Sequence, residues 1–168
     1  KAGFRPDYTT IVYSKILKEI FPDVPVVIGG IEASMRRLTH YDYWKDKLEP
    51  SILFSSGADM LIYGMGEQPL RELLKLLSKG VPFSSLKTIA QTGIVTGIND
   101  SLPLQKHWKD ISLNSFEKCL KDKKMFSDNF VKFEKESNKI ESARLNEPAG
   151  DLRVIINPPF PPMTEEEA

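Results

Sequence analysis

The sequence contains one cysteine, Cys119, among its 168 residues. Disulfide bonds need pairs of cysteines and cysteine-rich metal sites need three or four, so this chain can build neither by itself. A single thiol is typical of proteins of the reducing cytosol, and we expect a cytoplasmic protein. Cys119 stands near Phe116 and Leu120 on one helical face, which predicts a buried thiol.

Net charge and long apolar runs are also absent. Acidic and basic residues balance at 23 each, so no overall field favours nucleic acid or an anionic membrane as a partner. The dense basic run at residues 118–124 is interrupted by Asp122 and predicts a solvated helix face. No apolar run approaches the roughly 20 residues that cross a bilayer, and no signal peptide is visible. The missing initial methionine and the acidic end at residues 164–168 suggest a piece of a longer protein.

The chain has no phosphate-binding fingerprint, neither GxGxxG nor GxxxxGK[ST]. It does have two loops that combine glycines with a glutamate directly after apolar runs. In an open parallel sheet both loops would border the same crevice, where glycines allow close approach and helix starts offer amide donors to an anion. The alternatives are that the glycines form tight turns and that the glutamates cap helices. The residues concerned are Gly29, Gly30 and Glu32 in the first loop and Gly64, Gly66 and Glu67 in the second.

Hydrophobic spacing predicts an α/β fold, a Rossmann-like open parallel sheet that is incomplete, with a helical C-terminal part. Residues 9–21 have the spacing of a helix with one buried face. The all-apolar run at residues 24–28 predicts a parallel strand covered on both faces, and residues 58–63 predict a second strand. A leucine-faced helix follows and stops at Gly80; its leucines, if buried, would contribute roughly 1.5–3 kcal/mol each. They are Leu70, Leu73, Leu74 and Leu77.

The second half predicts one or two edge-type strands at residues 88–96, and helices from about residue 112 onward. Phe126, Phe130 and Phe133 follow at spacings of four and three, which indicates packing on a neighbour rather than ligand binding. Residues 145–151 contain proline and glycine and predict a linker before a final strand. We therefore divide the chain into residues 1–98, a Rossmann-like domain; residues 99–151, a helical insertion or extension; and residues 152–168, a strand with a proline-rich linker.

The stretch from residue 25 to residue 44 is the main candidate for a functional loop. Arg36 and Arg37 suit an anion, although a salt bridge to a nearby carboxylate explains them equally well. His40 stands in an acid–base-like cluster with tyrosines, yet a lone histidine without a nucleophile is more often structural. The candidate ligand-binding residues are Gly29, Gly30, Glu32, Arg36, Arg37, His40, Tyr41, Tyr43, Trp44, Gly64, Gly66 and Glu67.

Three strings resemble the YgiQ family of bacterial radical SAM proteins: IGGIEASMRRLTHYDYW, SSGADMLIYGMGEQPLREL and VIINPPFPPMTEEE. The resemblance implies a Rossmann-like module, similar to a cobalamin-binding domain, upstream of a radical SAM barrel, and that barrel is the expected partner within the same polypeptide. It also implies that the complete protein is an enzyme in which a CxxxCxxC motif holds a 4Fe-4S cluster that cleaves S-adenosylmethionine (SAM). Those cysteines would lie beyond Ala168.

The expected function is to shape or cover that active site without catalysis by this chain alone, so no catalytic residue and no metal ligand is predicted here. The loops are similar to those of cobalamin-dependent radical SAM proteins, which makes cobalamin a candidate ligand. The DxHxxG loop that supplies an axial histidine in that fold is absent, and His40 follows a different strand. The alternatives are a cobalamin- or nucleotide-binding module, and a structural or interaction domain whose aromatic residues 41–44 pack on the barrel. The substrate does not follow from the sequence.

Overall fold

The computed structural model describes residues 3–161, and within them it has a six-stranded mixed sheet and a separate two-stranded sheet. The helices are α1 (Thr9–Ile20), α2 (Gly30–Met35), α3 (Ile52–Ser56), α4 (Glu67–Ser78), α5 (Phe116–Lys121) and α6 (Lys123–Ser137), with a 3-10 turn, η1 (Phe83–Ser85). The strands are β1 (Val27–Ile28), β2 (His40–Asp42), β3 (Lys47–Glu49), β4 (Met60–Ile62), β5 (Thr92–Gly97), β6 (Asp110–Ser112), β7 (Arg144–Ala149) and β8 (Leu152–Ile156).

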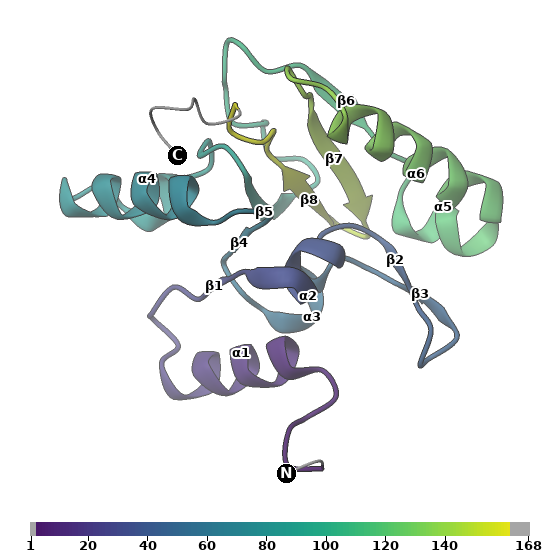
Figure 1. Ribbon diagram of the computed structural model, residues 1–168, viewed down its shortest axis with the longest axis horizontal. Coiled ribbons are helices and arrows are strands. Elements are labelled where there is room, and N and C mark those ends of the chain that lie inside the picture. The colour runs from purple at the N-terminus through teal and green to yellow at the C-terminus, as the bar shows by residue number, and fades with distance from the viewer. Residues whose placement is uncertain (1–2, 162–168) are drawn as a thin grey trace.

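The main sheet has the order β1-β4-β5-β8-β7-β6 and is open, so the α/β class is confirmed (Figure 1). The expectation of a parallel sheet is wrong for most of it. Only the pairs β1–β4 and β6–β7 are parallel, whereas β4–β5, β5–β8 and β8–β7 are antiparallel. A tight turn at Gly150, which has φ +59°, joins β7 directly to β8, and such a short connection permits only antiparallel pairing.

Strand β7 occupies the stretch that was expected to be a linker, so that prediction is wrong. Pro148 lies inside the strand, where proline is usually excluded because it cannot donate to a ladder. Strand β6 pairs only with residues 144–146, and β7 beyond them has one open side where a proline is tolerated. Strands from all three predicted segments, residues 1–98, 99–151 and 152–168, pair in this one sheet. The domain division itself stays a prediction.

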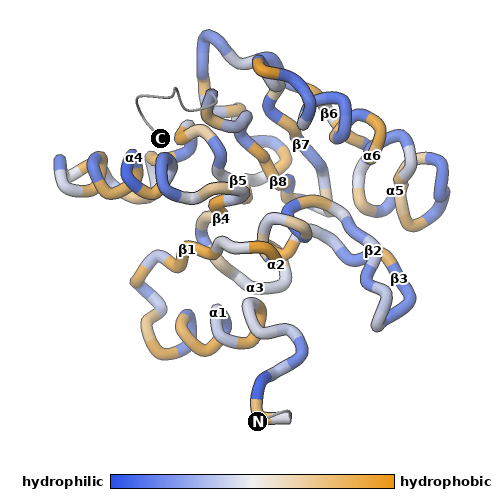
Figure 2. Tube along the Cα trace, viewed as in Figure 1, coloured by the Kyte–Doolittle hydropathy of each residue, from blue (hydrophilic) through white to orange (hydrophobic). Residues whose placement is uncertain are grey.

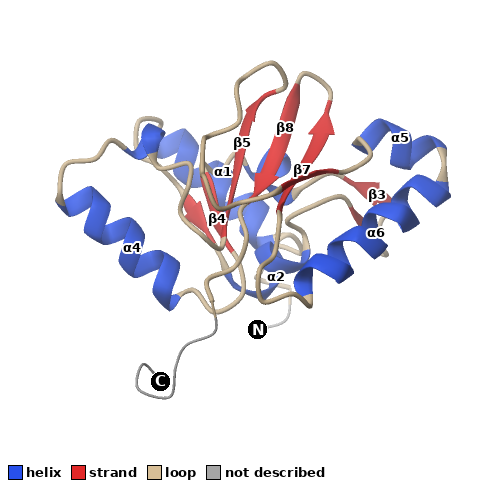
Figure 3. Ribbon diagram, turned by 90° about the horizontal axis from the view of Figure 1, so that it is seen from above, coloured by secondary structure: helices blue, strands red, loops and turns tan. Residues whose placement is uncertain are grey.

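The sheet is covered on both faces, and side chains that alternate along β4 and β8 point into two cores. Leu61 and Val154 lie in one core with residues of α2, α3 and α6, and Met60 and Ile155 lie in the other with residues of α4. Seen from above, α4 and the α5–α6 pair flank the strands on opposite sides (Figure 3). The hydropathy colouring places apolar segments along these central strands (Figure 2).

Helix α1 ends one residue before the predicted boundary, and β1 is much shorter than the predicted strand. The Val26 N–H donates to the Asp59 carboxylate at 2.7 Å, so strand pairing begins only at Val27. Helix α4 stops before Gly80, as expected, but only one of its four face leucines is buried, Leu73. The other three are exposed, and α4 joins the core through Leu73 and the partly buried Leu76. In residues 3–161 no helix is long and apolar enough to cross a membrane.

Candidate functional site

The two glycine-containing loops lie side by side, as the parallel pairing of β1 and β4 requires. The Gly64 N–H donates to Ser34 Oγ at 3.1 Å, which joins the second loop to α2. A Cβ on Gly29 would lie 3.3 Å from the carbonyl oxygen of Ile62, so the chain crosses closely at this point. Gly30 starts α2 with φ +82°. These observations account for the glycines as tight turns; ligand contact by Gly29, Gly30, Gly64 or Gly66 stays a prediction.

Glu32 caps a helix, although not its own. Its Oε2 accepts the Thr10 N–H at 3.2 Å and the Thr10 hydroxyl at 2.5 Å, at the start of α1. Its Oε1 lies 3.3 Å from Nη1 of Arg36, whose Nη2 lies 3.8 Å from the buried Asp42. Glu32 therefore caps a helix, and Arg36 forms a salt bridge; these were the alternatives to ligand contact for the two residues. Glu67 stands in the first turn of α4, where a carboxylate suits the helix dipole.

Asp42 organises the turn between β2 and β3. Its Oδ1 accepts the N–H groups of Trp44 and Lys45 at 3.0 and 3.2 Å. The turn presents Tyr43 and Trp44 outward, with ring centroids 4.7 Å apart. Both rings are mostly exposed, so this part of the predicted site is a surface and not the wall of a cleft.

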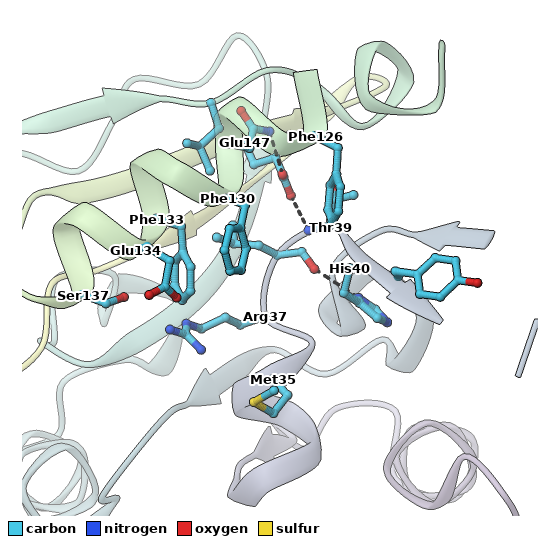
Figure 4. Close-up of a pocket in the computed structure, with 14 residues that line it drawn as sticks. Met35, Arg37, Thr39, His40, Phe126, Phe130, Phe133, Glu134, Ser137 and Glu147 are labelled. Atoms are coloured by element: carbon cyan, nitrogen blue, oxygen red, sulfur yellow. Dashed lines mark hydrogen bonds between the residues drawn. The ribbon is translucent and has the colours of Figure 1, made fainter. Parts of the chain in front are cut away.

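Three of the predicted residues, Arg37, His40 and Tyr41, meet at a cavity of about 460 Å³, which we call the central cavity (Figure 4). It lies between the end of α2, strand β2, helix α6 and strand β7. The residues that line it are Met35, Arg37, Leu38, Thr39, His40, Tyr41, Leu113, Phe126, Asn129, Phe130, Phe133, Glu134, Ser137 and Glu147.

Arg37 is held by the protein itself. Its guanidinium lies over the rings of Tyr63 and Phe133, at 4.7 and 4.5 Å from their centroids, and Nη1 donates to the carbonyl oxygen of Ser34. Burial lowers the pKa of Arg37, and the charge of Glu134 acts in the opposite direction. Two aromatic faces and a nearby carboxylate therefore already stabilise the Arg37 guanidinium, which the sequence suggested as a binding group for an anion.

His40 faces the rim of the cavity and is half-buried. Its Nδ1 lies 3.1 Å from the carbonyl oxygen of Leu38. Burial lowers the pKa of His40 below its ordinary value, so the imidazole is neutral near pH 7.

The floor of the cavity is a carboxylate that the sequence analysis missed. Glu147 on β7 is only 2% exposed, and its Oε2 accepts the Thr39 N–H at 2.8 Å. Its Oε1 accepts a long hydrogen bond of 3.4 Å from Asn129 Nδ2. Burial raises the pKa of Glu147 to about 7. Glu147 was not predicted as a site residue because the proline and glycine near it are typical of a loop. The spacing of the phenylalanines did indicate the apolar face of α6, which forms the opposite wall of the cavity.

The residues of this chain do not fit a 4Fe-4S cluster, which needs three thiolates for its iron atoms. Cys119 is buried, as predicted, and burial raises the pKa of its thiol to about 11. No group of three His, Cys, Asp or Glu residues that could hold a metal ion occurs in residues 3–161. They do not fit cobalamin through an axial histidine either, because His40 lies in the two-stranded sheet, away from the carboxyl ends of β1 and β4.

The fold and the site define an α/β domain with a mixed open sheet and a cavity beside its loop edge. A family model described as "Radical SAM N-terminal" matches residues 1–168, and the chain belongs to this family. The resemblance found in the sequence is thereby confirmed.

The relatives carry the name UPF0313 protein. The chain is 53% identical over 165 residues to one from Porphyromonas gingivalis, covering 98% of this chain and 26% of the relative. It is 46% identical over 178 residues to one from Bacteroides thetaiotaomicron, with coverage of 99% and 28%. A third, from Geobacter sulfurreducens, is 41% identical over 165 residues, with coverage of 98% and 27%. The chain thus spans about a quarter of the length of these relatives. No solved structure matches it.

Proposed function

We propose that this chain is the N-terminal part of a radical SAM enzyme, and that it frames the active site without supplying catalytic groups. In this proposal the cluster cysteines and the SAM site belong to the remainder of the polypeptide, and one edge of this domain packs against that remainder. The parallel β1–β4 unit, with helices on both faces of the sheet, supports a relationship to Rossmann-like modules of the cobalamin-binding type.

The observation that carries the proposal is a group of large apolar side chains at the loop edge, which we call the docking edge. They are between 54% and 86% exposed, although large apolar patches are normally buried or used as interfaces. Two of the residues lie on α2, and one follows Gly64, which is bonded to α2. Three lie on the β2–β3 hairpin, whose Asp42 is paired with Arg36 at the end of α2. They are Ile31, Met35, Tyr41, Tyr43, Trp44 and Met65.

The experiment introduces charge at the docking edge of the full-length polypeptide. Ile31→Glu and Met65→Glu should raise hydrogen exchange in α2 and in the loop after β4, and should lower SAM turnover, because a buried glutamate opposes docking. Leu104→Glu is the matched control, because Leu104 is 97% exposed and lies far along the chain in another loop. Neither Ile31 nor Met65 lines the central cavity.

Equal behaviour of all three variants would refute the docking edge. A loss of thermal stability with unchanged SAM turnover would replace the proposal with a purely structural domain. A cobalamin chromophore retained by the full-length protein would replace it with a cobalamin-binding module.

A further inference from the structure

The central cavity has a construction that packing alone does not require. One wall is the face of α6 that carries Phe126, Phe130 and Phe133, and Phe130 is 56% exposed. The opposite side is the end of α2 and the segment that leads into β2 (Figure 4). The volume of about 460 Å³ lies in the range of small-molecule sites. An apolar body of the size of a phenylalkyl group would be in contact with aromatic rings.

The charges of the cavity do not balance within the protein. Arg37 is placed between two rings near Glu134, so these two opposite charges offset one another. Glu147 has no such partner: among residues 3–161 no cationic side chain forms an ion pair with it. The charge that acts on it is that of Glu117 on α5, another carboxylate, which raises the pKa of Glu147 further. A buried carboxylate without a cation is costly, and a bound cation would remove that cost.

Glu147 also has unused acceptor capacity. An ionised carboxylate offers about four lone-pair positions. Hydrogen bonds come from the Thr39 main chain at 2.8 Å and from Asn129 at 3.4 Å, and the Thr39 hydroxyl also lowers the pKa of Glu147 by hydrogen bonding, which leaves about one position for a ligand donor. Cations are further stabilised by the faces of aromatic rings, which the α6 wall provides.

We propose that the central cavity binds a small organic cation, a primary ammonium or amidinium group on an apolar or aromatic body, with the cationic group against Glu147. Met35 and Tyr41 belong both to the docking edge and to the cavity lining, but the residue that carries this proposal, Glu147, is not part of the docking edge. The raised pKa of Glu147 supports it, since a bound cation would favour the ionised form of a carboxyl that is only partly ionised at neutral pH.

The test measures binding of matched probes to the full-length polypeptide by calorimetry at about pH 8, where Glu147 is ionised. The probes are 2-phenylethylammonium, the neutral 2-phenylethanol and the anionic 3-phenylpropanoate, with benzamidine as the amidinium. We expect the two cations to bind about tenfold or more tightly than the alcohol, and the anion to bind most weakly.

Glu147→Gln should remove the preference for the cations and leave the binding of the alcohol unchanged, which also shows that the variant is folded. Phe130→Ala should weaken the alcohol and the cations, and the cations somewhat more because they also lose a ring face, but a preference for the cations should remain because Glu147 is intact. Glu117→Gln is the matched control, because the charge of Glu117 acts on Glu147 but Glu117 does not line the cavity.

The proposal is overturned if neither cation binds to the wild-type protein, or if the cations and the alcohol bind equally. It is also overturned if Glu117→Gln abolishes the preference as strongly as Glu147→Gln does. In each of those cases Glu147 serves only to tie the segment before β2 to the sheet.

Discussion

Replacing Glu147 by glutamine should flatten the dependence of stability on pH between about pH 5 and pH 8. Burial raises the pKa of this carboxyl from 4.5 to about 7 in the folded protein. Between these values the folded state keeps a proton that the unfolded state has released, so the free energy of unfolding falls as the pH rises. The difference corresponds to about 3 kcal/mol across the range.

The assay is urea unfolding of the chain followed by far-UV circular dichroism, for the wild type and Glu147→Gln at several pH values. His40 has the opposite effect on the pH dependence of stability. Burial lowers its pKa, so the folded state loses its proton at a lower pH than the unfolded state, and the free energy of unfolding rises with pH. The quantity to compare is therefore the difference in slope between the two proteins. Glu117→Gln should keep most of the wild-type slope. Equal slopes for the wild type and Glu147→Gln would refute the reasoning.

Four further substitutions test the packing and the backbone conformation by the same unfolding assay. Arg37→Met keeps an aliphatic side chain but removes the cation between two rings, and should lower the free energy of unfolding by about 1–2 kcal/mol. An unchanged free energy of unfolding would contradict a stabilising contact between the guanidinium and the rings. Glu32→Gln weakens the cap of α1 and the pair with Arg36, and should cost about 1 kcal/mol, with hydrogen exchange rising first in α1; unchanged exchange there would contradict the capping role. Gly93→Ala brings a Cβ to 2.9 Å from a side-chain atom of Ile156 and should cost about 1–3 kcal/mol, whereas Gly57→Ala, with open space and φ +68°, should cost about 1 kcal/mol from its left-handed backbone alone.

Periodicity and turn chemistry predicted some of the local elements. The apolar spacing placed α1 and α4 within a few residues, and strand β8 lies where the final strand was expected. The side-by-side arrangement of the two glycine loops followed from the parallel pairing of β1 with β4, which the sequence also indicated. The helices and strand β8 depend on residues close together in the chain, so local patterns report them directly, whereas the loop arrangement was inferred from the way parallel strands pair.

Pairing direction and coverage could not be predicted in the same way. The leucine spacing of α4 defines an apolar face, but whether a neighbour covers that face depends on segments elsewhere, and only Leu73 is buried. Glu147 was missed because a carboxylate beside Pro148 and Gly150 is typical of a loop. Its burial arises from Thr39 and from Asn129, which are distant in sequence.

The hydrogen bond from Thr39 to Glu147 joins residues 108 positions apart, and the Tyr63 hydroxyl reaches the carbonyl oxygen of Asn157 across 94 positions. A ribosome releases the first half of this chain well before β7 and β8 exist. Helices α1 to α4 can form from local contacts during that interval, but the walls of the cavity face water until the last strands arrive. During synthesis, the apolar side chains that will line the cavity are therefore exposed to water until β7 and β8 pair with the rest of the sheet.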